Sequence, residues 1–184
     1  MIAAVRGSDM AVQEVLQFGD PSLRECATEV EDFEAASVTQ TMRDLEDTLH
    51  DLQRIHNKGG GLAAPQIGSP TKIVYVNARG RSFFLVNPEI VKQSDEMFEV
   101  WDFCFSANAS FLAQITRHQR ITVDYQDGEG NRHQEEFVDY FSELLQHEID
   151  HLHGRLFIDL IERPETITMV EEWDRTHGYS LDQP

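Results

Sequence analysis

The sequence contains few cysteines, few basic residues and no long hydrophobic run. Two cysteines, Cys26 and Cys104, cannot form a disulfide framework, which predicts a reduced, cytoplasmic protein. No stretch approaches the roughly 18 consecutive apolar residues of a membrane-spanning helix. Residues 1–15 carry charged side chains where a secretion signal has an apolar core. We therefore expect neither secretion nor a membrane partner.

The charge of the chain is strongly one-sided. Its 15 lysines and arginines are outnumbered by 33 aspartates and glutamates, which gives a formal net charge of −18. Such a surface repels the phosphates of nucleic acid and of anionic lipid, so neither is expected as a partner. The length of 184 residues and the 40% of hydrophobic residues suit one domain, residues 1–184, which we expect to be a monomer.

The hydrophobic pattern predicts helices and short strands. Apolar side chains recur every three or four positions over residues 33–57, as on the buried face of a helix, and three glycines follow. A second helix is predicted over residues 140–153 and a weaker one over residues 164–177. Short apolar runs predict strands at residues 73–76, 83–86, 121–125 and 136–138, the last two joined by a hairpin turn. Such elements indicate an α+β domain.

The second predicted helix carries the pattern H-E-x-x-H at His147, Glu148 and His151. A step of four residues is nearly one helical turn, so both imidazoles leave the same face and can bind one metal ion. Glu148 then lies close enough to touch a water on that metal without binding the metal itself. The metal lowers the pKa of the water toward about 7 and the carboxylate moves its proton, which is the chemistry of hydrolysis.

The simpler alternative to a metal site is an exposed helix that carries two histidines by chance, and the apolar pattern argues against it. Phe141, Leu144, Leu145, Ile149 and Leu152 mark the buried side, and the H-E-x-x-H side chains lie beside it, where polar groups need partners. The next histidine along the chain, at position 153, projects to the other side and is expected in solvent.

The third metal ligand separates the classes of enzyme that use this pattern. In the longer metzincin pattern the last position would be histidine, and here it is Phe157. A thermolysin-like protease would use a downstream glutamate, and Glu165, Glu171 and Glu172 are available, although the chain is short for a two-lobed protease. A soft thiolate is offered upstream by Cys104. By itself, a lone cysteine is more often a small buried hydrophobe.

Three stretches resemble motifs of the peptide deformylase family. Residues 59–66, Gly-Gly-Gly-Leu-Ala-Ala-Pro-Gln, resemble its G-x-G-L-A-A-P-Q motif, and residues 146–154 resemble Q-H-E-x-D-H-L-x-G. Residues 15–24 are similar to its opening segment, and the order agrees over about residues 12–162. Residues 102–106, Asp-Phe-Cys-Phe-Ser, stand where the family has E-G-C-L-S. Aspartate therefore replaces glutamate at position 102, and phenylalanine replaces glycine at 103 and leucine at 105.

The resemblance implies a metal site and a reaction. Cys104, His147 and His151 would hold one divalent metal, with Fe²⁺ implied by the family and Zn²⁺, Ni²⁺ or Co²⁺ also suited to these ligands. Glu148 would act as general base and then general acid. The substrate would be an N-formylmethionyl peptide, which would lose its formyl group as formate. The fold would consist of short antiparallel strands packed around a central metal-binding helix.

The resemblance also assigns the residues around the substrate. The side-chain amide of Gln66 and the backbone N–H of Phe105 would stabilise the oxyanion. Gly59, Gly60 and Gly61 would let main chain approach the peptide. Phe103 would line the cleft, and Asp102 would pair with Arg117. Because phenylalanine at position 103 could narrow or reshape the cleft, two alternatives stay open: an enzyme acting on a different N-formyl or N-acyl amine, and a catalytically weak metal-binding homologue.

Overall fold

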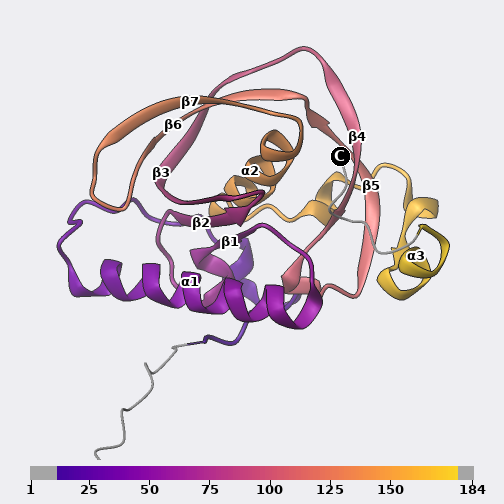
Figure 1. Ribbon diagram of the computed structural model, residues 1–184, viewed down its shortest axis with the longest axis horizontal. Coiled ribbons are helices and arrows are strands. Elements are labelled where there is room, and N and C mark those ends of the chain that lie inside the picture. Colours follow the sequence, from indigo (N-terminus) through magenta and orange to yellow (C-terminus); the bar gives the residue numbers. More distant parts are fainter. Residues whose placement is uncertain (1–11, 178–184) are drawn as a thin grey trace, which may run out of the picture.

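The computed structural model describes residues 12–177, and expectations about residues 1–11 and 178–184 lie outside that part of the chain. The described residues form two antiparallel sheets, three α-helices and short 3-10 turns, which confirms the α+β class. Figure 1 shows α2 (Asp139–Leu152) at the centre, with α1 (Ala36–His56) along one side and α3 (Val170–His177) outside β4 and β5. Within residues 12–177 no helix is both long and apolar enough to cross a membrane.

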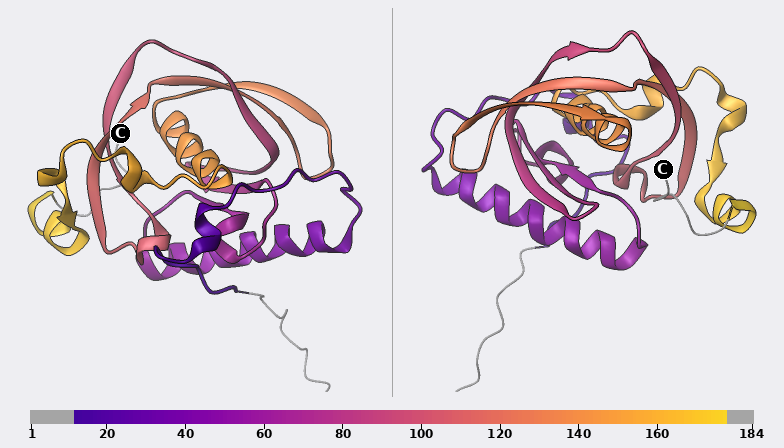
Figure 2. Two further views of the ribbon diagram at one scale, coloured as in Figure 1. Left: turned by 180° about the vertical axis from the view of Figure 1, so that it is seen from behind. Right: turned by 45° about the horizontal axis from the view of Figure 1, so that its top comes forward.

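The larger sheet has the strand order β1-β2-β3-β6-β7, with each neighbouring pair antiparallel. Its register with β6 shifts twice along β3, and such irregularities increase local bending. Figure 2 shows this sheet curving around α2 in both views. The strands are β1 (Gly61–Ala63), β2 (Ile73–Ala78), β3 (Arg81–Gln93), β6 (Arg120–Gln126) and β7 (Arg132–Val138).

The smaller sheet has the order β4-β5-β8, formed by β4 (Met97–Phe103), β5 (Phe111–His118) and β8 (Thr168–Met169). Cys104 follows the last residue of β4 directly. Both β4 and β1 are edge strands of their sheets, so each has one side without a strand partner. These two free edges border the same cavity, described below.

Most elements lie where the sequence predicts them. The long helix begins three residues later than expected, at Ala36, and ends at His56, where Asn57 adopts a left-handed conformation two residues before the glycines. The metal-motif helix is shifted by one residue from the predicted range, to Asp139–Leu152. All four predicted strands fall inside observed ones, although β3 is much longer.

The prediction of one helix over residues 164–177 is wrong in its first half. A 3-10 turn covers Pro164–Thr166, β8 follows it, and only Val170–His177 is α-helical. The β-branched residues Thr166, Ile167 and Thr168 disfavour helix, and pairing with β5 gives this stretch an alternative. Strands β1, β4, β5 and β8 were not predicted from the sequence.

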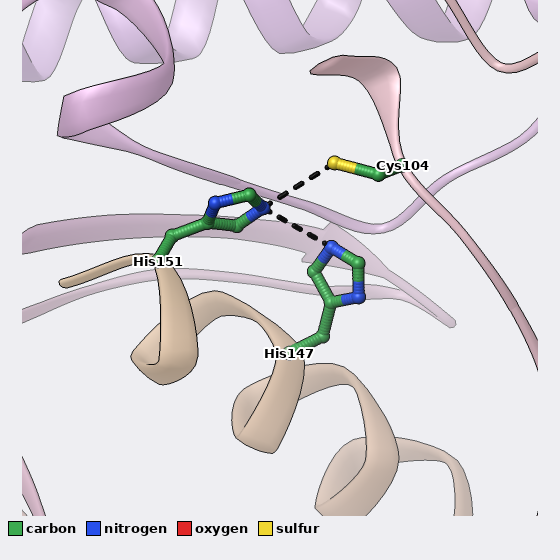
Figure 3. A group of neighbouring side chains, drawn as sticks. All are labelled: Cys104, His147 and His151. Atoms are coloured by element: carbon green, nitrogen blue, oxygen red, sulfur yellow. Dashed lines mark hydrogen bonds between the residues drawn. The ribbon is translucent and has the colours of Figure 1, made fainter. Parts of the chain in front are cut away.

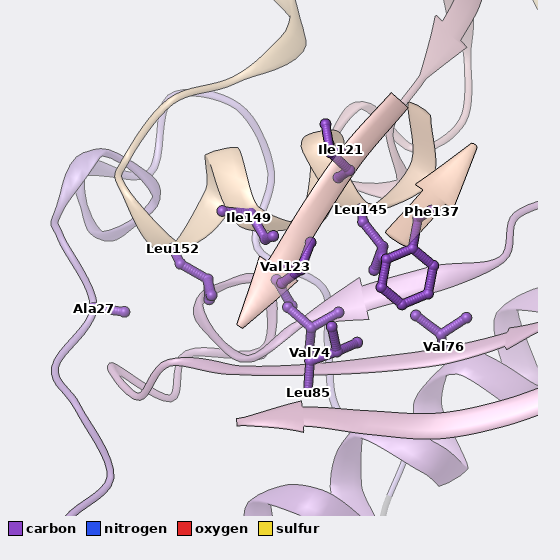
Figure 4. Packing of buried hydrophobic residues seen from close by; sticks show 11 residues of the cluster. Ala27, Val74, Val76, Leu85, Ile121, Val123, Phe137, Leu145, Ile149 and Leu152 are labelled. Atoms are coloured by element: carbon purple, nitrogen blue, oxygen red, sulfur yellow. The ribbon is translucent and has the colours of Figure 1, made fainter. Parts of the chain in front are cut away.

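The main core lies between the larger sheet and α2. Figure 4 shows Leu145, Ile149 and Leu152 of α2 packed against strand residues such as Val74 and Val123. All of these side chains are buried, and each such aliphatic side chain stabilises the fold by about 1.5–3 kcal/mol through its removal from water. The packing fixes which face of α2 turns away from this core, and that face carries the metal motif.

Hydrogen bonds tie α2 to other segments in its middle and at its C-terminal end. In the middle, Gln146 donates from Nε2 to the backbone oxygen of His118 at 2.8 Å and accepts from the backbone N–H of His118 at 3.0 Å. At the C-terminal end, the N–H of Ala27 donates to the oxygen of Leu152 at 2.8 Å. Gly154 then turns the chain at φ +68°, and a Cβ there would lie 2.4 Å from the backbone oxygen of Arg24. The position of α2 is therefore determined along its length.

Candidate metal centre

Three buried side chains bring possible metal-ligating atoms together. Cys104 Sγ lies 3.3 Å from His151 Nε2, which lies 3.2 Å from His147 Nε2, and all three atoms lie within 4.8 Å of one another. Figure 3 shows both rings, one turn apart on α2, directed toward the sulfur that follows β4. Ligands at about 2.0–2.3 Å from one tetrahedral ion lie about 3.3–3.6 Å apart, so the spacing fits. In the described part of the chain no other group of this kind occurs.

The orientation of His147 is fixed by a carboxylate behind it. Its Nδ1 lies 2.8 Å from Asp102 Oδ1, so Nδ1–H donates to Asp102 and Nε2 faces the cluster. Burial lowers the pKa of His147, but the charge and hydrogen bond of Asp102, together with Cys104, outweigh burial and raise that pKa well above its usual value. The pKa of His151 is lowered by burial and then by neighbouring His147, which keeps its ring neutral and able to bind a metal.

Asp102 is held in turn by a buried arginine. Arg117 Nη2 donates to Asp102 Oδ2 at 3.2 Å, which is the contact that the resemblance implies. The other end of the guanidinium donates to Asp150, which no sequence argument assigned a role. Burial opposes a charge on Asp102, yet His147 and Arg117 hold its pKa below the usual value. His147 is therefore linked through Asp102 and Arg117 to Asp150 by hydrogen bonds between charged groups.

The donor set fits a metal ion. Beside it, Glu148 Oε2 is buried and has no hydrogen-bond partner among the described residues. A thiolate with two imidazoles suits a divalent transition metal rather than Mg²⁺ or Ca²⁺, which prefer oxygen ligands. The group of Cys104, His147 and His151 is therefore consistent with a single metal ion.

Glu148 lies beside this group and close to the first strand. Burial raises its pKa to about 7. A Cβ on Gly61 would lie 2.8 Å from both Cγ and Oε1 of Glu148, so the absence of a side chain there makes room for the carboxylate. A buried carboxyl whose pKa lies near neutrality can both take and release a proton.

Gln66 is oriented by its own turn. Its Oε1 accepts from the N–H of Ala63 at 2.8 Å, so the amide nitrogen must point the other way. That nitrogen lies 3.5 Å from Cys104 Sγ and 3.3 Å from Ser106 Oγ. Phe105, whose backbone N–H is the second candidate donor, is the first residue of the 3-10 turn that follows Cys104. Two candidate donors therefore flank the sulfur.

A cavity of about 450 Å³ borders the cluster. Gly59, Gly60 and Gly61 line one side and Phe103 lines another. A Cβ on Gly59 would lie 2.4 Å from the ring of Phe105, which itself meets the Phe103 ring edge-on at a centroid distance of 5.8 Å. The structure thus brings the site residues that the resemblance implies to one place, except that Arg117 reaches it only through Asp102.

Other cavity residues were missed by the sequence analysis. Trp101 of β4 and Trp173 of α3 both line the cavity, with ring centroids 4.3 Å apart. Glu143, one turn before His147, also lines it. Its step of four residues before His147 was a signal that could have been used. Trp173 gave no such signal, because its position depends on the fold of the chain after β8.

The alternative third ligands do not approach the cluster. Glu165, Glu171 and Glu172 are all exposed, and none belongs to the metal-ligating group. Phe157, at the metzincin position, is buried with its ring 6.1 Å from that of His147. His153 is exposed, as expected. The geometry therefore gives no support to the protease alternatives.

Comparisons with known proteins agree with this geometry. The family model for polypeptide deformylase matches residues 12–166. The peptide deformylase of Bartonella tribocorum is 36% identical over 173 residues, which cover 90% of this chain and 93% of that protein. The peptide deformylase of Heliobacterium modesticaldum is 39% identical over 153 residues, covering 83% and 96%. The crystal structure of a peptide deformylase from Legionella pneumophila is 32% identical with a TM-score of 0.76, covering 84% of this chain and 88% of that one. The chain therefore belongs to the peptide deformylase family, a family of hydrolases.

Proposed function

We propose that this chain removes the N-formyl group from N-formylmethionyl peptides and releases formate. The observation that carries the proposal is the buried group of Cys104, His147 and His151, with Glu148 beside it, on the wall of a cavity of about 450 Å³. Family membership supports the same reaction. The protein would act as a cytoplasmic monomer formed by one domain, and its charge of −18 supports the absence of a nucleic-acid partner.

Each residue of the site has a role in this proposal. A divalent metal, when bound, supplies a Lewis acid and a water of lowered pKa for attack on the formyl carbon. Glu148 takes the proton of the attacking water and returns it to the departing amine nitrogen. The amide of Gln66 and the N–H of Phe105 donate to the formyl oxygen as it gains negative charge. Asp102 keeps His147 in the tautomer that presents Nε2.

We propose Fe²⁺ as the resident metal, held by Cys104, His147 and His151. One thiolate and two neutral imidazoles also suit Zn²⁺, Ni²⁺ and Co²⁺, so metal analysis after purification without oxygen is required.

The peptide would bind in an extended form between two sheet edges. The cavity is bordered by residues around the edge strand β1 and by the edge strand β4. An extended chain can hydrogen-bond to a free strand edge, and glycines at positions 59–61 allow the close approach that this needs.

A formate-release assay tests this function. Protein purified without oxygen should contain about one transition metal per chain and release formate from formyl-Met-Ala-Ser at a typical enzymatic rate of about 1–10³ s⁻¹. Metal present in this ratio, with no formate from any formylated peptide, would contradict the proposed function and leave a metal-binding homologue.

A second candidate function is hydrolysis of a different N-formyl or N-acyl amine. The observation in its favour is Phe103, whose side chain lines the cavity. A panel of formyl and acetyl peptides would separate this candidate from the first, since only the second predicts higher kcat/KM for a substrate other than formyl-Met-Ala-Ser.

We expect Phe103→Gly to raise kcat/KM for formyl-Met-Ala-Ser. The benzyl group occupies space in the cavity, and its removal should favour a long side chain by about tenfold, the scale of one or two methylenes in a pocket. Phe103→Ala should change the rate in the same direction with less loss of strand stability. A formyl-Gly peptide is the control, because it has no side chain to accommodate. Unchanged kinetics with both variants would show that Phe103 does not narrow the site.

We expect Gly61→Ala to lower kcat/KM by about 10- to 100-fold, because the new methyl group displaces the carboxylate of Glu148. Circular dichroism and metal content should stay unchanged. Gly128→Ala is the matched control, since a Cβ there has no neighbour closer than 3.6 Å. Full activity of Gly61→Ala would mean that Glu148 can move without consequence.

A further inference from the structure

Glu143 is an acidic side chain in the cavity that the hydrolytic mechanism does not use. It lies one helical turn before His147 on α2, in the row that continues to His151. It lines the cavity together with Tyr140 and Leu144 of the same helix. Its carboxylate therefore borders the space beside the metal group rather than the outer surface of the protein.

Glu143 has no partner of its own within residues 12–177. No hydrogen bond or ion pair to its carboxyl group occurs there, whereas Asp102 is held by both His147 and Arg117. The one arginine lining the cavity, Arg79, stacks over the ring of Tyr140 at 4.0 Å. Burial and, next, the charge of Asp102 raise the pKa of Glu143 to about 8, against the opposing charges of Arg117, His147 and Arg79. A half-buried acid without a partner is unfavourable in the free protein.

The position of Glu143 corresponds to a defined part of the substrate. Four residues of helix rise about 6 Å, so Glu143 stands about that far along α2 from His147. From the formyl carbon the substrate continues through nitrogen and Cα into the side chain of the formylated residue. A lysine-sized side chain that runs along α2 inside the cavity would span a comparable distance and bring its outer atoms near Glu143.

The remaining walls suit a positively charged group. Trp101, Phe103 and Trp173 line the cavity, and aromatic faces attract cations. Asp139 lines it as well, and the chain as a whole carries a charge of −18, whereas the Glu99 carboxylate in the cavity wall is already paired with Arg163. A cationic side chain would gain from Glu143 and from the aromatic faces, whereas a purely apolar one would leave Glu143 unpaired.

We propose that Glu143 determines substrate specificity by binding a positively charged, hydrogen-bond-donating end on the side chain of the formylated residue. The inference rests on the proposed deformylase chemistry and favours the second candidate function, with formylated residues of the lysine type as substrates in place of formylmethionine. The ammonium group donates to the Glu143 carboxylate, while norleucine, which has the same chain without the ammonium, has no such contact.

Competing turnover tests the proposal. With metal-loaded enzyme, we expect the ratio of kcat/KM for formyl-Lys-Ala-Ser to that for formyl-norleucyl-Ala-Ser to fall by about tenfold or more in Glu143→Leu, mainly through KM. Glu143→Gln, which keeps the shape without the charge, should give an intermediate ratio. Glu136→Gln removes one charge at an exposed position outside the cavity and should keep the wild-type ratio.

A binding measurement separates this proposal from the function on which it rests. In the Glu148→Gln background, calorimetry gives the Kd of both peptides without turnover, and adding Glu143→Leu should weaken only formyl-Lys-Ala-Ser. An equal effect of Glu143→Leu on both peptides, in Kd and in kcat/KM, would overturn the role of Glu143 while formate release continues. Failure of every peptide to yield formate would overturn the proposed function instead, and Glu143 would then be judged by the ratio of the two Kd values.

Discussion

Glu148→Gln is expected to lower formate release from formyl-Met-Ala-Ser by about 10²–10⁴-fold while the metal stays bound. Glutamine has nearly the same shape but cannot take a proton from water or return one to the amine nitrogen. The three candidate ligands are untouched by the change, so metal content should remain at about one per chain. Steady-state kinetics and elemental analysis on the same preparation measure both quantities.

The stability of this variant gives a second readout. Glu148 is 4% exposed, and its Oε2 has no hydrogen-bond partner among the described residues. Replacing a buried, unsatisfied carboxyl with a neutral amide should therefore leave the melting temperature unchanged or raise it. Glu136→Gln, at an exposed position, serves as the control for the change in charge. Near wild-type turnover of Glu148→Gln would mean that another group moves the proton, and loss of the metal would mean that Glu148 is needed to retain it.

The helix that carries the metal motif could be predicted from sequence because its signals are local. Its apolar residues repeat at helical spacing, and a glycine follows it, so the predicted range of 140–153 differs from Asp139–Leu152 by one residue at each end. The spacing of His147 and His151 follows directly from that helix. Both histidines are buried, on the face of α2 beside the one that the apolar pattern marks.

The third corner of the cluster could not be derived in this way. Cys104 lies 43 residues before His147 in the chain, and no periodicity relates the two. It reaches the histidines only because β4 pairs with β5, and both strands were missed. In β4 and β5, polar and apolar residues occur on both faces of the strand, because β4 borders a cavity. The alternation that would predict a strand is therefore weak. The resemblance to the family supplied what local patterns lacked.

Contacts around the cluster were predicted only in part. The resemblance implies that Asp102 pairs with Arg117, and that contact is present, but the shorter contact from Asp102 to His147 was not foreseen. The unpaired state of Glu143 could not be foreseen either, because it depends on which side chains of other elements face it. Such relations are tertiary, and no spacing within the sequence encodes them.

Cys104→Ala is expected to abolish both metal binding and formate release. Two imidazoles without the thiolate hold a divalent ion far less tightly. Because Asp102 raises the pKa of His147, a proton also competes with the metal for Nε2 of that ring. After brief dialysis against a chelator, the wild type should keep about one metal per chain and the variant almost none. The wild type should also show a melting temperature that rises with added metal, since an ion at about 100 times its Kd adds about 2.7 kcal/mol to the stability of the folded state.

The second cysteine provides the matched control. Cys26 is exposed, and within residues 12–177 its thiol hydrogen-bonds to the backbone oxygen of His153 at 3.7 Å, so Cys26→Ala should change neither metal content nor turnover. If Cys104→Ala kept a full complement of metal, the third ligand would have to come from elsewhere, and the exposed Glu165, Glu171 and Glu172 would become the residues to substitute next. If Cys104→Ala lost the metal and Cys104→Asp retained it, a negatively charged ligand at this position would be sufficient for metal binding. The sulfur would then matter for the rate of formate release rather than for metal binding.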